Sequence, residues 1–216
     1  MHPGQLNLTN GIPITEYKIY NDSNGKHDLM LLKLPNPTNI RPIKLPSDAE
    51  CRNRPQTVQI AGYAAKTTGP NNERVRGGST TLQCADIPVV NCSRLRSCLQ
   101  NRNPQSWKLY QHWFCGQSST TDTSKGDSGG GVVHGCRIYG VHSFTGNHTH
   151  ACVEAAGFID VCNSGYKGWI KRIAHLVLLC CGHEVCRAEA RYNCTHTGKT
   201  YRTFGCNGPG MVLPSL

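Results

Sequence analysis

Short apolar runs alternate with clusters of Gly, Asn, Pro and Ser from residue 57 onward. Such runs, bounded by turn residues, are typical of β-strands. Several of them at regular spacing predict an antiparallel barrel or sandwich, and therefore an all-β fold. The expected strands are Thr57–Tyr63, Thr80–Val90, Trp113–Gly116, Gly130–Gly135, Ile138–Phe144 and Ala156–Val161.

A helical pattern follows the last of these strands. Apolar residues recur at helical spacing over Tyr166–Leu179, which predicts one C-terminal helix packed against the barrel. Earlier in the chain, Asp28–Leu34 is expected to be a strand with its acidic residue at the start. Ser47–Pro55 is expected to be a linker.

The charge and the hydropathy narrow the classes of partner. The net charge is +10, but the basic residues are spread along the chain and no basic cluster is interleaved with aromatic residues. We therefore expect no nucleic acid partner, and at most an attraction to sulfated glycans or an acidic granule matrix. The longest apolar stretch, Ile173–Cys181, is too short to span a bilayer, so no membrane partner is expected.

Thirteen cysteines in 216 residues predict disulfides and an oxidising compartment, either extracellular or in a secretory granule. N-glycosylation sequons fit a secreted glycoprotein, and they begin at Asn7, Asn21, Asn91, Asn147 and Asn193. The first ten residues have no basic and apolar segments of a signal peptide. Because a secreted protein should have a signal peptide, we expect that the front of the protein is absent from this sequence.

The segment Gly126–Gly130 carries the clearest chemistry. Glycines around Ser128 allow a tight turn in which the hydroxyl is a candidate nucleophile. The backbone N–H groups of Gly126 and Ser128 could converge on an oxyanion. A plain Gly/Ser-rich loop is the alternative, and the apolar runs that follow the motif argue against it.

A series of motifs in one order resembles the trypsin-like serine proteases over roughly residues 5 to 173. The motifs are His27–Leu34, Ile40–Pro46, Ala61–Ala64, Leu82–Cys84, Trp113–Gly116, Gly126–Gly130 and Phe158–Ile170. The resemblance implies a double antiparallel β-barrel whose N-terminal barrel is incomplete. It divides the chain into a partial N-terminal barrel (1–50), a C-terminal barrel with its closing helix (51–173) and a Cys-rich tail (174–216).

The resemblance also implies the roles of the site residues. Ser128 would be the nucleophile, Asp28 the carboxylate that orients the base, and Gly126 with Ser128 the oxyanion hole. Asp127 would pair with a new N-terminal amine on activation. A carboxylate that only caps a strand is the alternative for Asp28.

In the family that this chain resembles, substrate choice is set by the residue six positions before the nucleophile, which here is Asp122. A carboxylate in a deep pocket pairs with Arg or Lys side chains, so the resemblance implies cleavage after these residues. Ser143, Phe144, Thr145 and Gly146 would line the substrate channel. An ordinary loop acid is the alternative for Asp122. Protein substrates and serpin-type inhibitors are the implied partners, and no cofactor or metal is expected.

The resemblance further implies a disulfide between Cys51 and Cys162, and one between Cys115 and either Cys92 or Cys98. Ser124 stands where many relatives have a cysteine, so Cys152 would be free or differently paired. Cys84 and Cys136 have no evident partner. The cysteines of the tail, with His183 and His196, fit no common zinc pattern, and a disulfide-containing, disordered or alternative-exon tail is expected instead.

One family motif is absent: no Ala-Ala-His-Cys sequence precedes Asp28, and none of the ten histidines has that setting. His27 adjoins the acid, but neighbouring side chains on a strand face opposite ways. Three hypotheses remain: a trypsin-like protease whose catalytic His is missing from this sequence, a non-catalytic homologue that binds a partner, and an unrelated disulfide-rich binding module. The first is favoured because Ser128, Asp28 and Asp122 are all present.

Overall fold

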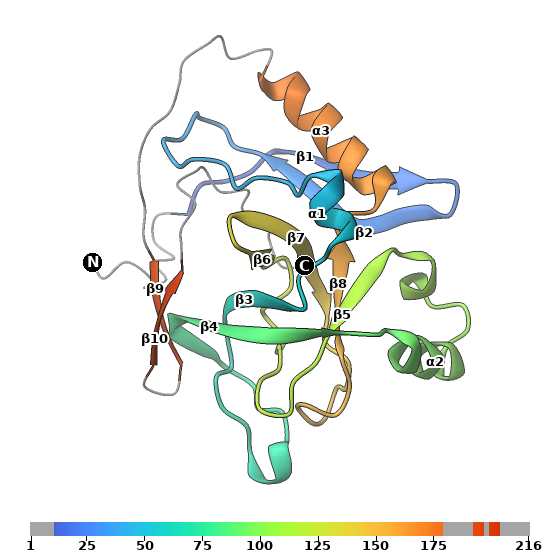
Figure 1. Cartoon of the computed structure of the whole chain (residues 1–216), viewed down its shortest axis with the longest axis vertical. Coiled ribbons are helices and arrows are strands. Elements are labelled where there is room, and N and C mark those ends of the chain that lie inside the picture. The colour runs from blue at the N-terminus through green and yellow to red at the C-terminus, as the bar shows by residue number, and fades with distance from the viewer. Residues whose placement is uncertain (1–10, 179–191, 197–198, 204–216) are drawn as a thin grey trace.

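A closed six-stranded antiparallel barrel forms the centre of the computed structural model, which describes residues 11–178, 192–196 and 199–203 (Figure 1). Around the barrel the strand order is β3-β4-β5-β8-β7-β6. The strands are β3 (Thr57–Ala64), β4 (Gly78–Val90), β5 (Trp113–Gly116), β6 (Gly131–His134), β7 (Arg137–Phe144) and β8 (Ala156–Asp160). All six strands expected from the sequence are confirmed, and their ends differ from the expected ones by at most two residues.

The barrel interior is apolar, as the alternation along its strands requires. Val58, Ile87, Val132, Ala156 and Phe158 form one buried cluster there. The rings of Phe114 and Phe158 lie 5.3 Å apart at its edge. Together with Phe114, these residues come from five different strands, so their packing holds the strands of the barrel together from the inside.

The segment before the barrel forms a two-stranded antiparallel sheet of β1 (Glu16–Asp22) and β2 (Gly25–Lys33). The expected strand at Asp28 is confirmed, but the expectation that the acid starts it is wrong. The strand begins at Gly25, because the chain turns at Ser23 and Asn24 and Gly25 then pairs with Asp22 of β1.

The C-terminal helix α3 (Ser164–Leu178) closes this end of the molecule and confirms the expected helix. Its residues Tyr166, Trp169 and Ile170 share a buried cluster with Leu29 and Leu31 of β2. Figure 1 shows α3 lying along the β1-β2 sheet. The helix therefore supplies the apolar surface on which β2, the strand of Asp28, is held.

Two further helices were not expected. The short helix α1 (Asp48–Arg52) occupies the expected linker, and Ser47 with Glu50 forms its capping box. The helix α2 (Ser93–Arg102) is polar except for Leu95 and Leu99, which are one turn apart and buried. Short 3-10 turns, η2 (Pro70–Asn72) and η3 (Trp107–Tyr110), lie in two of the loops.

Two disulfide bonds agree with the pairings that the resemblance implied. Cys51 is bonded to Cys162, and Cys92, rather than Cys98, is bonded to Cys115. Cys98 and Cys152 are free thiols. Cys84 and Cys136 are both disulfide-bonded, which corrects the expectation that neither had a partner.

In the tail, β9 (Tyr192–His196) and β10 (Lys199–Thr203) pair antiparallel. The expectations for its cysteines, His183 and His196 concern side chains outside the described part of the structure. In the described residues, no helix is long and apolar enough to cross a membrane.

Candidate active site

The turn that carries Ser128 is built on glycine conformations. Gly126 and Gly129 have φ values of +114° and +84°, a region that other residues rarely adopt. The N–H of Gly129 donates to the carbonyl of His142, and the N–H of His142 donates to the carbonyl of Gly130, both at 2.8 Å. These two bonds fix the turn against β7.

Ser143 on β7 lies between the two predicted catalytic residues. Its Oγ donates a hydrogen bond of 2.5 Å to Oδ2 of Asp28. Its backbone carbonyl accepts a hydrogen bond of 3.4 Å from Oγ of Ser128. The structure thus brings the predicted nucleophile and the predicted carboxylate to the same residue, although they are far apart in sequence.

The strand β2 directs His27 and Asp28 to opposite sides, as its alternation requires. Nδ1 of His27 lies 2.5 Å from the hydroxyl of Tyr166, and its Nε2 lies 3.0 Å from Oδ1 of Asp22. His27 is buried among these groups, whereas Asp28 faces Ser143. Within the described residues, no hydrogen bond joins a histidine side chain to Asp28 or Ser128.

Asp127 lies next to Ser128 in the chain, and its carboxylate is bound by backbone groups of two other residues. Its carboxylate accepts backbone N–H groups from Ser124 at 2.8 Å and from Ala64 at 3.3 Å. Gly62 leaves room for it, because a Cβ at that position would collide with Oδ1 of Asp127. Burial raises the pKa of Asp127 in spite of these two bonds, because a charged carboxylate is poorly solvated there.

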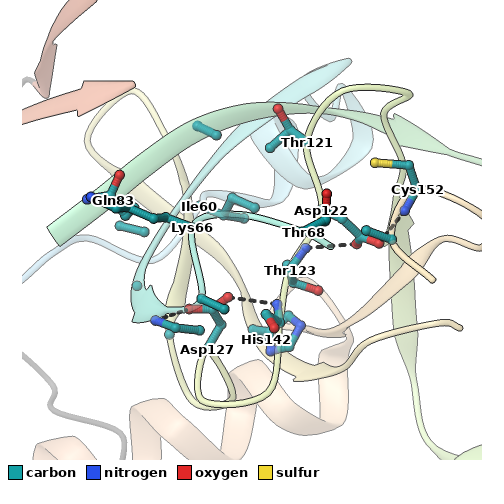
Figure 2. Close-up of a pocket in the computed structure, with 18 of the residues that line it drawn as sticks. Ile60, Lys66, Thr68, Gln83, Thr121, Asp122, Thr123, Asp127, His142 and Cys152 are labelled. Atoms are coloured by element: carbon teal, nitrogen blue, oxygen red, sulfur yellow. Dashed lines mark hydrogen bonds between the residues drawn. The ribbon is translucent and has the colours of Figure 1, made fainter. Parts of the chain in front are cut away.

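A cavity of about 280 Å³ lies beneath the turn, and Asp122, Asp127 and His142 all line it (Figure 2). His142 is buried, and neither of its ring nitrogens has a hydrogen-bond partner within the described structure. Burial, aided by the charge of Arg74, lowers the pKa of His142 to about 4, so the imidazole is neutral at pH 7. Ser128 is not among the residues that line this cavity.

The side chain of Asp122 is buried, and both of its carboxylate oxygens accept hydrogen bonds. Its Oδ1 accepts the N–H of Thr123 and its Oδ2 accepts the N–H of Cys152, both at 2.8 Å. The same Oδ2 accepts a hydrogen bond of 2.5 Å from Nη2 of Arg74. The predicted specificity carboxylate therefore already holds a guanidinium group from its own chain.

The other predicted channel residues, Ser143 to Gly146, are not among the residues that line the cavity beneath the turn. The hydroxyl of Thr145 is hydrogen-bonded to that of Thr123 at 3.0 Å, which joins this segment to the residue after Asp122. Phe144 is buried against Trp113, with the ring centroids 5.6 Å apart. Nζ of Lys108 lies 4.5 Å from the centroid of the Phe144 ring.

Sequence reasoning missed three residues of the site. Arg74 pairs with Asp122, Oε1 of Gln111 accepts the backbone N–H of Asp28 at 2.9 Å, and His142 lines the cavity. Arg74 and Gln111 are polar residues in loops, where nothing in the local pattern marks a distant partner. His142 had a detectable signal, because an ionisable residue inside an apolar strand is unusual.

Comparisons with known proteins match these features to one family. The family model described as Trypsin matches residues 4–170. Mouse Kallikrein-8 is 26% identical over 73% of this chain, and Trypsin-3 of Salmo salar is 24% identical over 79% of it. The chain spans 58% of the length of Kallikrein-8 and 67% of the length of Trypsin-3.

Solved structures agree on the fold. The scabies mite inactivated protease paralogue S-I1 has a TM-score of 0.54 at 22% identity, over 76% of this chain and 68% of that one. The paralogue S-D1 has a TM-score of 0.57 at 19% identity, over 75% and 68%. With a family model matching more than half of its length, this chain belongs to the trypsin family of serine proteases.

Proposed function

We propose that this chain acts as a serine-type endopeptidase that cleaves protein substrates after Arg or Lys. Ser128 is the nucleophile, Asp28 orients the base, and the N–H groups of Gly126 and Ser128 stabilise the oxyanion. The observation that carries the proposal is the position of Ser143, which hydrogen-bonds to Asp28 through its side chain and to Ser128 through its carbonyl.

The proposal assigns no histidine of this sequence as the general base. His27 is occupied by Tyr166 and Asp22 on the other side of β2, and His142 is buried in the cavity beneath the turn. Without a base, a serine triad retains only the rate supplied by its oxyanion hole and by substrate binding. We therefore expect this chain alone to turn over substrate very slowly.

The specificity for Arg or Lys rests on Asp122. Its carboxylate is buried and already forms an ion pair with a guanidinium group, which is the chemistry that an arginine substrate would present. Asp127 fits the proposed activation step, because its buried carboxylate accepts backbone N–H groups and lines a cavity where an amine could join it.

The disulfides fit an extracellular protein, and we propose secretion, with serpin-type inhibitors and sulfated glycans as further partners. The glycan proposal rests on the net charge of +10.

Exogenous imidazole tests the missing base directly. We expect hydrolysis of an arginine ester by the full chain to rise with imidazole concentration, because the small molecule can replace the absent side chain next to Ser128. The rise is expected to vanish in Ser128→Ala and to persist in the matched variant Ser124→Ala. A rise that is equal in all three proteins would overturn the proposal, since imidazole alone would then be the catalyst.

A second candidate function is binding without catalysis. It is favoured because, within the described residues, no histidine side chain forms a hydrogen bond to Ser128 or Asp28. The chain would then hold a basic peptide through Asp122. Binding of an arginine peptide with no Ser128-dependent hydrolysis at any imidazole concentration would support this function over the first.

A further inference from the structure

The loop between β3 and β4 brings a positively charged side chain into the predicted specificity site. This loop, residues 65–77, is anchored next to residues 147–150. The backbone N–H of Arg74 donates to the carbonyl of Thr149 at 2.8 Å, and the backbones of Glu73 and His150 form an isolated antiparallel β-bridge. The backbone of Arg74 is thus fixed beside the segment that follows the predicted channel wall.

Every nitrogen of the Arg74 guanidinium donates a hydrogen bond. Nη2 donates to Oδ2 of Asp122 at 2.5 Å, Nη1 to the carbonyl of Thr123 at 2.6 Å, and Nε to the carbonyl of Asn147 at 2.7 Å. The side chains of Arg74 and Asp122 are only 13% and 7% exposed. An ion pair on the surface contributes little to stability, whereas this pair is buried and both of its groups form several hydrogen bonds.

The acceptors that Arg74 uses are those that an incoming arginine would need. The single carboxylate of Asp122 cannot neutralise two guanidinium groups in a buried site, so a second cation would be left without a partner. Departure of Arg74 without a replacement would leave Asp122 buried and uncompensated, which is costly. A substrate cation and Arg74 therefore compete for one place.

We propose that Arg74 is an intramolecular occupant of the Asp122 site, and that a basic substrate side chain binds only by displacing it. Arg74 thereby sets the affinity of the site for cations, which makes it a specificity-determining residue outside the predicted catalytic machinery. This inference rests on the proposed function, because it takes Asp122 as the residue that recognises Arg or Lys. In the free protein Arg74 then occupies the Asp122 site, and movement of loop 65–77 opens this site to a substrate.

Small molecules that copy the two side chains test the competition. The probes are n-propylguanidine for arginine and n-butylamine for lysine, with the neutral n-propylurea as a control, and binding is measured by calorimetry. We expect Arg74→Ala to bind both cations roughly tenfold or more tightly than the unaltered chain. In the unaltered chain Arg74 fills the Asp122 site in most molecules, which lowers the apparent affinity for the probe. The urea should not gain in affinity.

Arg76→Ala is the matched control, since Arg76 is exposed in the same loop two residues further on. Its affinities should equal those of the unaltered chain. Equal cation affinities in the unaltered chain and in Arg74→Ala would overturn the occupancy by Arg74 and leave Asp122 as a cation site. No cation binding by either folded protein would overturn the Arg/Lys specificity itself, and the inference with it.

A measurement on the unaltered chain covers the case in which Arg74→Ala does not fold. Phenylglyoxal modifies exposed guanidinium groups, and mass spectrometry locates them. Arg74 should react more slowly than Arg76, and saturating n-butylamine should accelerate Arg74 alone, because the amine takes its place at Asp122. An unchanged Arg74 rate in an amine-bound protein would overturn the displacement.

Discussion

Oγ of Ser143 donates a hydrogen bond of 2.5 Å to Oδ2 of Asp28, which joins the central barrel to the β1-β2 sheet. Hydrogen bonds to charged acceptors are short and contribute more to stability than neutral ones. The bond therefore has a structural consequence that is independent of catalysis: it holds the carboxylate of β2 at the face of β7.

We expect Ser143→Ala to lower the free energy of unfolding by about 1–3 kcal/mol, because Asp28 loses a charge-assisted hydrogen bond while it stays partly buried. Urea denaturation at pH 7 measures the change. Ser119→Ala, on an exposed residue of the loop before the turn, is the matched control and should change it little. An equal effect of the two substitutions would contradict the importance of the Asp28 contact.

The sequence predicted the barrel well because each of its strands is a local pattern. Alternation and turn residues are visible in windows of a few residues, and the six strands need no distant partner to be recognised. The helix α2 was missed since only Leu95 and Leu99 mark its buried face. β1 was missed for a similar reason, because it is largely exposed and acquires its order by pairing with β2.

Residues of the candidate site could be named from the sequence only where family motifs mark them. Ser128, Asp28 and Asp122 could be named from their motifs, whereas their surroundings depend on long-range contacts. The pair of Arg74 and Asp122 spans 48 positions, and the ion pair forms because a loop and a turn meet in space. No period or motif in the sequence encodes such a meeting.

The disulfide between Cys51 and Cys162 should contribute strongly to stability. It closes a loop with a sequence separation of 111 residues, and it ties the end of α1 to the segment after β8. Loops of this size lose much entropy in the unfolded chain when they are cross-linked. We expect Cys51→Ala with Cys162→Ala to lower the free energy of unfolding by about 2–5 kcal/mol.

Thermal and urea denaturation measure this loss, with Cys98→Ala as the control because Cys98 is a free thiol. A double variant as stable as the control would show that the cross-link contributes nothing to the folded state.

Glu50 should make stability depend on acid pH. Its bonds to the backbone and side chain of Ser47, followed by the bond to Arg137, lower the pKa of Glu50 to about 2 from 4.5. A carboxyl whose pKa is lower in the folded state stabilises the fold above its unfolded pKa, and the contribution is lost as the pH falls. The contribution of Glu50 should thus be complete above about pH 5 and should disappear between about pH 4.5 and pH 2.

Comparison of the unaltered chain with Glu50→Gln in urea, at several values of pH, isolates this contribution. The difference in stability between them should shrink as the pH falls through that range. A difference that is constant with pH would contradict the assignment, because it would come from packing rather than from the charge.

His142 should also make stability rise with pH, although its ring nitrogens have no hydrogen-bond partner within the described structure. Burial, together with the charge of Arg74, lowers its pKa to about 4 from 6.5, so the folded state resists a proton that the unfolded chain accepts. Between these two values the unfolded state binds more protons, and stability must rise with pH. The gain on going from about pH 4 to pH 7 should be about 3 kcal/mol, since each pKa unit corresponds to about 1.4 kcal/mol.

Urea denaturation from pH 4 to pH 7 measures this gain, and His142→Leu should remove it because leucine does not titrate. His148→Asn, on an exposed histidine of the 145–150 loop, is the matched control and should keep the full pH dependence. If His142→Leu instead keeps the slope of the unaltered chain, another group must take up the proton. If the slope vanishes only in His142→Leu, the acid sensitivity of the barrel comes from one neutral imidazole enclosed beneath the Ser128 turn.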